Sequence, residues 1–343
     1  MSSATGLVEL DSLEMLVIVD NELDPISRYQ NEGVVATGNL ADIAFGSPYR
    51  PTDRGPGNVH EVRMEQLCQS AHGLSILMTG KKDGEEHSML FDVGPEEDAF
   101  ERNATRLHAQ LGKVEVVHLS HWHRDHSGGM LRAVKMINAA KGAGEAKVVV
   151  DLHPDRPDFR GVTTPAMQMS LEADPSFAEI ESGGGRVSKN DKAHAVCGGF
   201  FMISGEIPRV TAYEHGIRRG ARFSIAKGEW EKDELIKDER FVMCKVKDKG
   251  VIMFTGCSHA GVVNASKHAA ELAFGTPLFA IVGGYHLADA EMAQIESSVR
   301  DLKALNVKLF LAGHCTGWKA KYEIERQMPG RLAPCTVGTT FTF

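Results

Sequence analysis

The chain has 343 residues, of which 42% are apolar, so it can bury a substantial core. Its 46 acidic residues outnumber its 38 basic residues, and no run of Lys or Arg stands out. A protein that binds a nucleic-acid backbone would carry a basic stripe, so we expect no nucleic-acid partner. The longest apolar runs are too short to cross a bilayer, and we expect no membrane span.

The cysteines and the N-terminal residues indicate the compartment. The six cysteines are widely separated and form no Cys-x-x-Cys pair. The first eleven residues lack a basic segment followed by an apolar run, so we expect no signal peptide. These features predict reduced thiols and a cytoplasmic protein.

The first half of the chain alternates apolar strands with amphipathic helices. The periodicity predicts strands near 13–19, 73–78, 88–93, 114–119 and 147–152, and helices near 97–111 and 129–140. Residues 22–59 lack such a pattern and contain several turn signals, including Gly38-Asn39 and Ser47-Pro48. Because a long irregular segment in a compact protein is usually functional, we predict an active-site lid over 22–59.

The second half begins with a segment rich in Pro, Gly and Ser, which predicts a loop-rich insertion over about 154–240. The apolar pattern then predicts strands near 200–203, 241–246, 251–254, 278–282 and 307–311, and a helix near 290–305 capped by Asp289. Strands with intervening helices predict an α/β protein whose sheets are covered by helices.

A cluster of metal-binding residue types follows the predicted strand at 114–119. It reads His121-Trp122-His123-Arg124-Asp125-His126, which places three imidazoles and one carboxylate within six residues. Side chains at the end of a strand can converge on one point, where imidazole and carboxylate can hold one or two divalent metals.

Three further histidines repeat this placement. His259, His286 and His314 each follow shortly after an apolar strand. If these strands lie in neighbouring positions, their ends meet at one edge. We therefore predict that these histidines join the same site as His121 and His123.

The H-x-H-x-D-H pattern formed by His121, His123, Asp125 and His126 resembles the central motif of the metallo-β-lactamase superfamily. The resemblance implies an α/β (α+β) fold, the αββα sandwich, in which two mixed β-sheets pack face to face and helices cover the outer faces. It implies that residues 1–343 form a single domain with the metals at one edge of the sheets. It also implies that Asp92 supports the site.

A narrower resemblance extends over most of the chain. It rests on Asp20-Asn21, Ala71-His72-Gly73-Leu74-Ser75, Gly205-Glu206-Ile207-Pro208-Arg209, Thr255-Gly256-Cys257-Ser258-His259-Ala260-Gly261, Gly283-Gly284-Tyr285-His286-Leu287 and His314-Cys315-Thr316-Gly317. These motifs look like the branch of dihydropterin–ribofuranosylaminobenzene phosphate synthase-like metal-dependent hydrolases. Some fungal relatives in this branch are associated with opening lactam or cyclic carbamate rings. Relatives commonly dimerise, so the resemblance implies a possible homodimer.

The superfamily pattern also implies a ligand set. His121, His123 and His259 would hold a first metal, and Asp125, His126 and His314 a second. The superfamily often places a bridging Asp between the third and last motifs, where this chain has His286 and, three residues on, Asp289. His286 is then either a ligand or a substrate contact, and the site holds one or two metals.

Several other residues are candidates for catalysis or substrate binding. We predict catalytic roles for Asp125 and His286, and substrate contacts for His72, Trp122, Arg209 and Tyr285. Three alternatives remain open: a structural hydrogen bond for His72, packing behind the site for Trp122, and an ion pair between Arg209 and Glu206. We expect Cys257 and Cys315 to pack behind the site rather than to bind metal, and His118 to be a core residue.

The ligand types alone do not name the metal, because Zn²⁺, Mn²⁺ and Fe²⁺ all accept imidazole and carboxylate. We expect one or two divalent ions, with Zn²⁺ as the first choice. A metal lowers the pKa of its bound water to about 7 and so supplies hydroxide at neutral pH. The leading hypothesis is therefore a hydrolase that opens a small cyclic amide, carbamate or ester. One alternative is a phosphoester hydrolase or pterin-linked transferase, which would need cations such as Arg124, Arg209 or Lys319. The other is a non-hydrolytic metal protein, such as an iron oxygenase.

Overall fold

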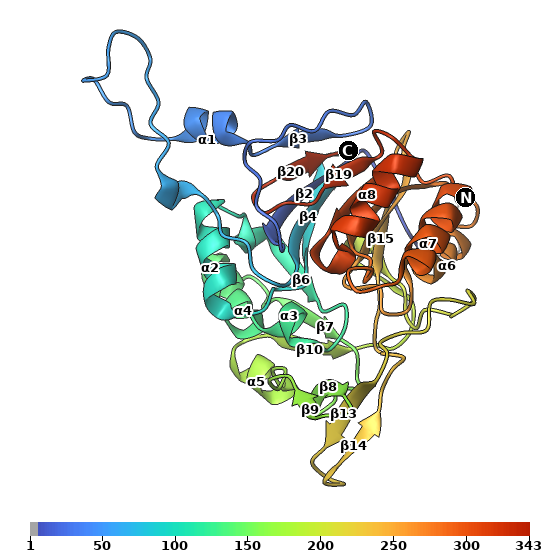
Figure 1. The fold of residues 1–343 in the computed structure, drawn as a ribbon. Coiled ribbons are helices and arrows are strands. Elements are labelled where there is room, and N and C mark those ends of the chain that lie inside the picture. The colour runs from blue at the N-terminus through green and yellow to red at the C-terminus, as the bar shows by residue number, and fades with distance from the viewer. Residues whose placement is uncertain (1–5) are drawn as a thin grey trace.

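The structure, a computed structural model, describes residues 6–343. Two eight-stranded sheets pack against each other, and a four-stranded sheet projects from one end of them (Figure 1). Helices α6 (Val262–Leu272), α7 (Met292–Ala304) and α8 (Trp318–Gln327) lie on one side. Helices α2 (Glu97–Arg106), α4 (Met130–Ala140) and α5 (Phe177–Ser182) lie on the other.

The first large sheet is mixed, with the strand order β10-β7-β6-β5-β4-β2-β20-β3. Its strands are β10 (Arg186–Lys189), β7 (Val149–Leu152), β6 (Val114–His118), β5 (Glu85–Phe91), β4 (Ser75–Lys82), β2 (Ser12–Val19), β20 (Thr340–Thr342) and β3 (Val35–Thr37). Strands β5, β6, β7 and β10 are parallel, so their carboxyl ends lie at one edge.

The second large sheet has the order β11-β12-β15-β16-β17-β18-β19, and β1 pairs with β15. Its strands are β11 (His194–Val196), β12 (Phe201–Ile203), β15 (Val242–Val246), β16 (Gly250–Thr255), β17 (Leu278–Gly284), β18 (Leu309–Gly313), β19 (Leu332–Pro334) and β1 (Glu9–Leu10). Strands β16 to β19 are parallel, which brings the segments that follow them to a common edge.

Alternation along the strands explains why the sheets stack. In β16, Ile252 and Phe254 point into the core between the two sheets. Val251 and Met253 point the other way, into the core beneath the helices. Side chains of a strand alternate between faces, so a strand that is apolar at every position must be covered on both. The structure thereby confirms the predicted αββα arrangement.

The predicted insertion is more regular than we expected. Strands β10, β11 and β12 lie within residues 154–240 but belong to the two large sheets. The four-stranded sheet has the order β14-β13-β8-β9 and consists of β14 (Glu229–Lys232), β13 (Gly220–Ser224), β8 (Phe159–Thr163) and β9 (Gln168–Ser170). The Pro and Gly residues that suggested a loop therefore separate short strands.

The segment 22–59 is only partly irregular. It contains β3 at the edge of the first sheet and helix α1 (Leu40–Gly46), whose N-cap Asn39 forms a capping box with Asp42. The chain after α1 projects away from the sandwich (Figure 1). A lid role for this segment stays a prediction. No helix within residues 6–343 is both long and apolar enough to span a membrane.

Candidate metal centre

Segments that follow four strands of the two sheets carry the site. His121 and its neighbours follow β6 in the first sheet. His259, His286 and His314 follow β16, β17 and β18 in the second sheet. The sequence prediction that histidines from successive strand ends meet is confirmed by the contacts between their rings.

The first donor cluster consists of three imidazoles. Nε2 of His121 lies 2.9 Å from Nδ1 of His123, and Nε2 of His259 lies 3.1 Å from each of these two atoms. Two nitrogens bound to one tetrahedral zinc at about 2.0–2.1 Å lie about 3.3 Å apart. The three nitrogens therefore have nearly the spacing that a shared metal requires.

The chemistry of these nitrogens also fits a cation. Nδ1 of His121 lies 2.9 Å from Oγ of Ser120, and that hydroxyl donates to Asp92, so His121 donates from Nδ1 and keeps a lone pair on Nε2. Burial, reinforced by neighbouring cationic groups, lowers the pKa of His123 to about 3 and the pKa of His121 and His259 well below the usual value. Neutral imidazoles with converging lone pairs are the form that binds a metal.

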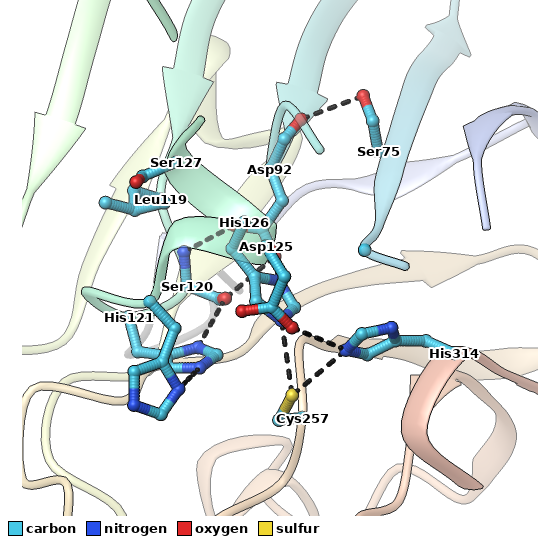
Figure 2. Close-up of polar contacts among 12 residues, drawn as sticks. Ser75, Asp92, Leu119, Ser120, His121, Asp125, His126, Ser127, Cys257 and His314 are labelled. Carbon is cyan, nitrogen blue, oxygen red and sulfur yellow. Dashed lines mark hydrogen bonds and ion pairs between the residues drawn. The ribbon is translucent and has the colours of Figure 1, made fainter. Parts of the chain in front are cut away.

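The second donor cluster contains Asp125, His126, His314 and Cys257. Oδ2 of Asp125 lies 3.5 Å from Nε2 of His126 and 3.3 Å from Nε2 of His314. Sγ of Cys257 lies 3.2 Å and 3.1 Å from the same two nitrogens, and Figure 2 shows it between the rings. The prediction that Cys257 packs behind the site is wrong, because its sulfur points at the donor atoms.

Asp92 contacts residues of both clusters, in agreement with the supporting role that the family resemblance implies. Its Oδ2 accepts from Oγ of Ser120 at 2.7 Å and lies 2.6 Å from Nδ1 of His126 (Figure 2). Its Oδ1 accepts from the backbone N–H of Ser120 at 2.7 Å. One buried carboxylate thereby orients a ligand of each cluster, a common arrangement around protein metal ions.

Comparison with family models gives no match. The chain is 30% identical over 275 residues to 7,8-dihydropterin-6-methyl-4-(beta-D-ribofuranosyl)-aminobenzene-5'-phosphate synthase of Methanocaldococcus jannaschii, covering 77% of this chain and 90% of that protein. It is 26% identical over 253 residues to an uncharacterized protein of the same organism, covering 73% of this chain and 85% of that protein. The crystal structure of Tm1679, described as a metal-dependent hydrolase of the beta-lactamase superfamily, superposes with a TM-score of 0.65 at 22% identity and covers 96% of this chain and 98% of that one.

The chain belongs to the metallo-β-lactamase superfamily, in the branch of this synthase. The metallo-β-lactamase fold implies divalent metal ions, and the two donor clusters are where this chain would hold them. The fold brings together the donor atoms of the residues that the superfamily motif implies, and Sγ of Cys257 lies among them; their role as metal ligands stays a prediction.

This metallo-β-lactamase fold orients His314 through the two residues that follow β2. The backbone N–H of His314 donates to Oδ2 of Asp20 at 3.0 Å, and Nδ1 of His314 lies 2.9 Å from Oδ1 of Asn21. His314 has a φ of 46°, a strained value for a residue other than glycine, and these contacts hold it there. The Asp20-Asn21 motif is therefore a support for the last ligand.

Sequence reasoning missed a buried tripeptide, Asp238-Glu239-Arg240, which holds both ligand loops. Oδ2 of Asp238 accepts from the N–H of Trp122 at 2.8 Å, between two ligands. The Glu239 carboxylate accepts from the N–H groups of His259 and Ala260 at 2.7 Å and 2.6 Å. Three consecutive charged residues read as a solvated loop, and only their burial reveals the role.

Two predicted site residues lie beside the clusters. Nε2 of His72 lies 3.6 Å from Oδ2 of Asp125, and the His72 side chain is 70% exposed, which places it at the mouth of the site. The ring of His286 lies 4.4 Å from the ring of His259, and its Nδ1 is buried without a hydrogen-bond partner. His286 shares a donor group with Cys257 and Cys315 but not with the other ligands. The catalytic role of His286 stays a prediction.

The substrate contacts predicted for two aromatic residues are wrong. Trp122 is completely buried, and its indole N–H donates to the carbonyl of His153, so it packs behind the site. Tyr285 is 1% exposed, and its hydroxyl donates to the carbonyl of Ile281 in the core beneath the helices. Each polar atom already has a partner inside the protein, which leaves nothing to offer a substrate.

Two remaining residues, Arg209 and His118, are placed by their contacts. The guanidinium of Arg209 donates to the carbonyls of Ile207 and Leu235, and the described residues include no ion pair between Arg209 and Glu206. Within residues 6–343, Arg209 forms no hydrogen bond or ion pair with a residue of the donor clusters, and its substrate role stays a prediction. His118 is buried, and its Nδ1 lies 3.4 Å from Oδ1 of Asp151, in agreement with a core role.

Proposed function

We propose that this protein is a metal-dependent hydrolase that opens a small cyclic amide, carbamate or ester of the lactam or lactone type. The observation that carries the proposal is the pair of donor clusters side by side at one sheet edge, with Asp125 partly open to solvent. Its side chain is 18% exposed, whereas His126 and His314 beside it are fully buried. Bound metals would thus be held by buried histidines, and a substrate would reach them past Asp125.

The residues around the clusters fit this chemistry. When bound, divalent metals supply an activated water nucleophile at neutral pH and polarise the electrophilic carbonyl. The ring of His286 stands beside His259 with a free Nδ1, so it can hold a proton for the leaving nitrogen or oxygen. His72 at the mouth can contact and orient the substrate.

A neutral acyl substrate suits the surrounding charges better than a phosphate. A phosphate site needs cations with free donors. Arg124 instead donates to the carbonyl of Ala173 and pairs with Glu172 at 3.3 Å. Arg209 is engaged by backbone carbonyls.

A second candidate function is favoured by the synthase at 30% identity. That relative is named for a phosphate-bearing pterin product, so a pterin-linked transferase or phosphoester hydrolase is the alternative. It would require Lys319, which is exposed at the start of α8, or a rearranged arginine to bind the phosphate.

The test is a substrate panel on the full-length protein, stripped of metal and reloaded with Zn²⁺, Mn²⁺ or Fe²⁺. The panel contains a lactone, a lactam, a cyclic carbamate and a phosphodiester, and products are identified by mass spectrometry. We expect a ring-opened product that has gained one water. Chelation should abolish the reaction, and so should His123→Ala and Asp125→Asn.

The matched control is His108→Asn, which changes an exposed histidine outside the site and keeps a residue that tolerates its positive φ of 50°. It should retain full activity. Ring opening by metal-free protein would overturn the proposal. Turnover of the phosphodiester alone would replace it with the second candidate, and oxygen consumption would replace it with an iron oxygenase.

A further inference from the structure

We propose that the Cys257 thiolate is the bridging ligand of a two-metal centre, in the role that an aspartate from a later strand often has in the superfamily. The proposal rests on the metal centre of the proposed function but not on its substrate. It concerns a residue that the superfamily ligand pattern does not contain.

The turn after β16 aims Cys257 and His259 into the site together. Ser258 between them has a φ of 60°, and its hydroxyl donates to the carbonyl of Gly284 at 2.8 Å. The same hydroxyl lies 2.8 Å from Oγ1 of Thr255. A residue fixed in the left-handed region reverses the chain, so the residues on both sides of Ser258 can face the same point.

The turn also packs closely against Ser120 and Asp92, the residues that orient histidines of both clusters. A side chain at Gly256 would place its Cβ 2.3 Å from Oγ of Ser120 and 3.3 Å from Oδ2 of Asp92. Only glycine permits this approach, which brings Cys257 over the atoms that orient His121 and His126.

The sulfur reaches donor atoms of both clusters. It lies within 4.8 Å of the donor atoms of His121 and His259 and, in a second group, of Asp125, His126 and His314. Cys257 belongs to every group of potential metal ligands found among residues 6–343. Two metal–sulfur bonds of about 2.3 Å can join metals that are about 3.5–4 Å apart, the usual separation in two-metal sites.

The histidine nitrogens beside the sulfur are also arranged as a cation-binding site would require. Nδ1 of His126 faces Asp92 and Nδ1 of His314 faces Asn21, so these histidines present Nε2 to Cys257 at 3.2 Å and 3.1 Å. One thiol hydrogen can serve only one of two such nitrogens. A metal bound by both nitrogens and by the sulfur satisfies all three.

No carboxylate competes for the bridging position. Asp125 is the only carboxylate in the donor groups of the described residues, and it belongs to the second cluster. Asp289, the acidic residue nearest in sequence to the expected bridge, is exposed. A thiolate carries the same charge as a carboxylate but is softer, so it favours Zn²⁺ over Mn²⁺.

The experiment titrates metal-free, full-length protein with Co²⁺ under reducing conditions, without substrate. Cobalt bound to a thiolate gives a near-ultraviolet charge-transfer band. We expect this band to grow through the first and the second equivalent in the wild-type protein. Cys257→Ser should abolish the band and weaken the second equivalent at least tenfold, while Cys315→Ser should change neither.

Cys315 is the comparison variant because it is the other thiol in the donor groups of the described residues: its Sγ shares a group with Cys257 and His286 and donates to the backbone carbonyl of Cys257 at 3.5 Å. A band lost in Cys315→Ser would assign the sulfur to the wrong residue in our proposal. A band that saturates at the first equivalent would make Cys257 a terminal ligand, and absence of a band in wild type would exclude a thiolate. Each of these results overturns the bridge.

X-ray absorption of the wild-type zinc protein tests the same point without a variant that has to fold. We expect a sulfur scatterer at about 2.3 Å and a second metal at about 3.5–4 Å. Absence of the sulfur shell would overturn the proposal. A confirmed sulfur bridge in a protein that hydrolyses none of the substrate panel would refute the proposed function and leave this inference intact.

Discussion

Asp238 holds the peptide between His121 and His123, and we predict that Asp238→Ala weakens both folding and metal binding. Oδ2 of Asp238 accepts from the N–H of Trp122 at 2.8 Å and from Nη1 of Arg160 at 3.1 Å. The same Nη1 donates to the carbonyl of Trp122 at 2.9 Å. The pair therefore binds both the N–H and the carbonyl of Trp122, the residue between His121 and His123.

The magnitude follows from the burial of the pair. The side chains of Arg160 and Asp238 are 2% and 1% exposed, and despite the opposing effect of burial Arg160 lowers the pKa of Asp238 to about 2. Removing one partner of a buried ion pair costs about 3–5 kcal/mol. Asp233, at 3.1 Å from Nη2 of Arg160, remains as a partner, so we expect the lower end, about 3 kcal/mol.

The assay is urea unfolding of metal-free protein, with metal affinity measured by competition with a coloured chelator. Loss of an outer contact to a ligand usually weakens metal binding by about 10–100-fold. Asp155→Ala is the control, because its pair with Arg222 is 54% exposed on the Asp155 side and contributes at most about 1 kcal/mol. A loss below about 1 kcal/mol with unchanged metal affinity would refute the reasoning.

Three further predictions concern other contacts. Glu239→Gln turns an amide donor toward the N–H groups of His259 and Ala260, so urea unfolding should show a loss of about 1–3 kcal/mol; an unchanged midpoint would contradict this. Removing metal with a chelator should lower the melting temperature, and re-adding Zn²⁺ should restore it. The free energy of unfolding should rise by about 4 kcal/mol when free metal is about 1,000-fold above Kd; identical melting curves would count against a bound metal. The hydrogen bond with Asp151 raises the pKa of His194, so this contribution is fully present below the unfolded pKa of about 6.5 and is lost as pH rises through the folded pKa. His194→Asn should remove that slope, at most about 1.4 kcal/mol per pH unit in urea unfolding, and equal slopes in both proteins would disprove the link.

The strands and most residues of the donor clusters could be predicted from local sequence. The predicted strands at 13–19 and 251–254 match β2 and β16 within two residues at either end. Apolar residues on both faces of a strand are visible in sequence because they reflect burial on both sides. The His-rich motif could be recognised because its residues are contiguous and follow a buried strand.

Helices α6 and α8 are two of the helices that escaped prediction, and the glycine before each of them reads as a turn. Helices α6 and α8 begin after Gly261 and Gly317, whose φ values are 100° and 78°, and neither start has a side-chain cap. Sequence reasoning relies on Ser, Thr, Asp or Asn at such positions. A glycine there reads as a turn, although here it lets the chain reverse directly from a ligand segment into a helix.

The sequence by itself determined the strand pattern, the family and six residues of the donor clusters, because each depends on residues close together or on a motif. Only the tertiary structure decided which way Cys257, Trp122 and Tyr285 point. Each of these residues lies within two residues of a candidate ligand, and a single residue step changes the face on which a side chain lies. Their partners come from other segments, as His314 does for Cys257 and His153 for Trp122. Contacts between distant segments depend on packing of the whole sandwich, which no local pattern records.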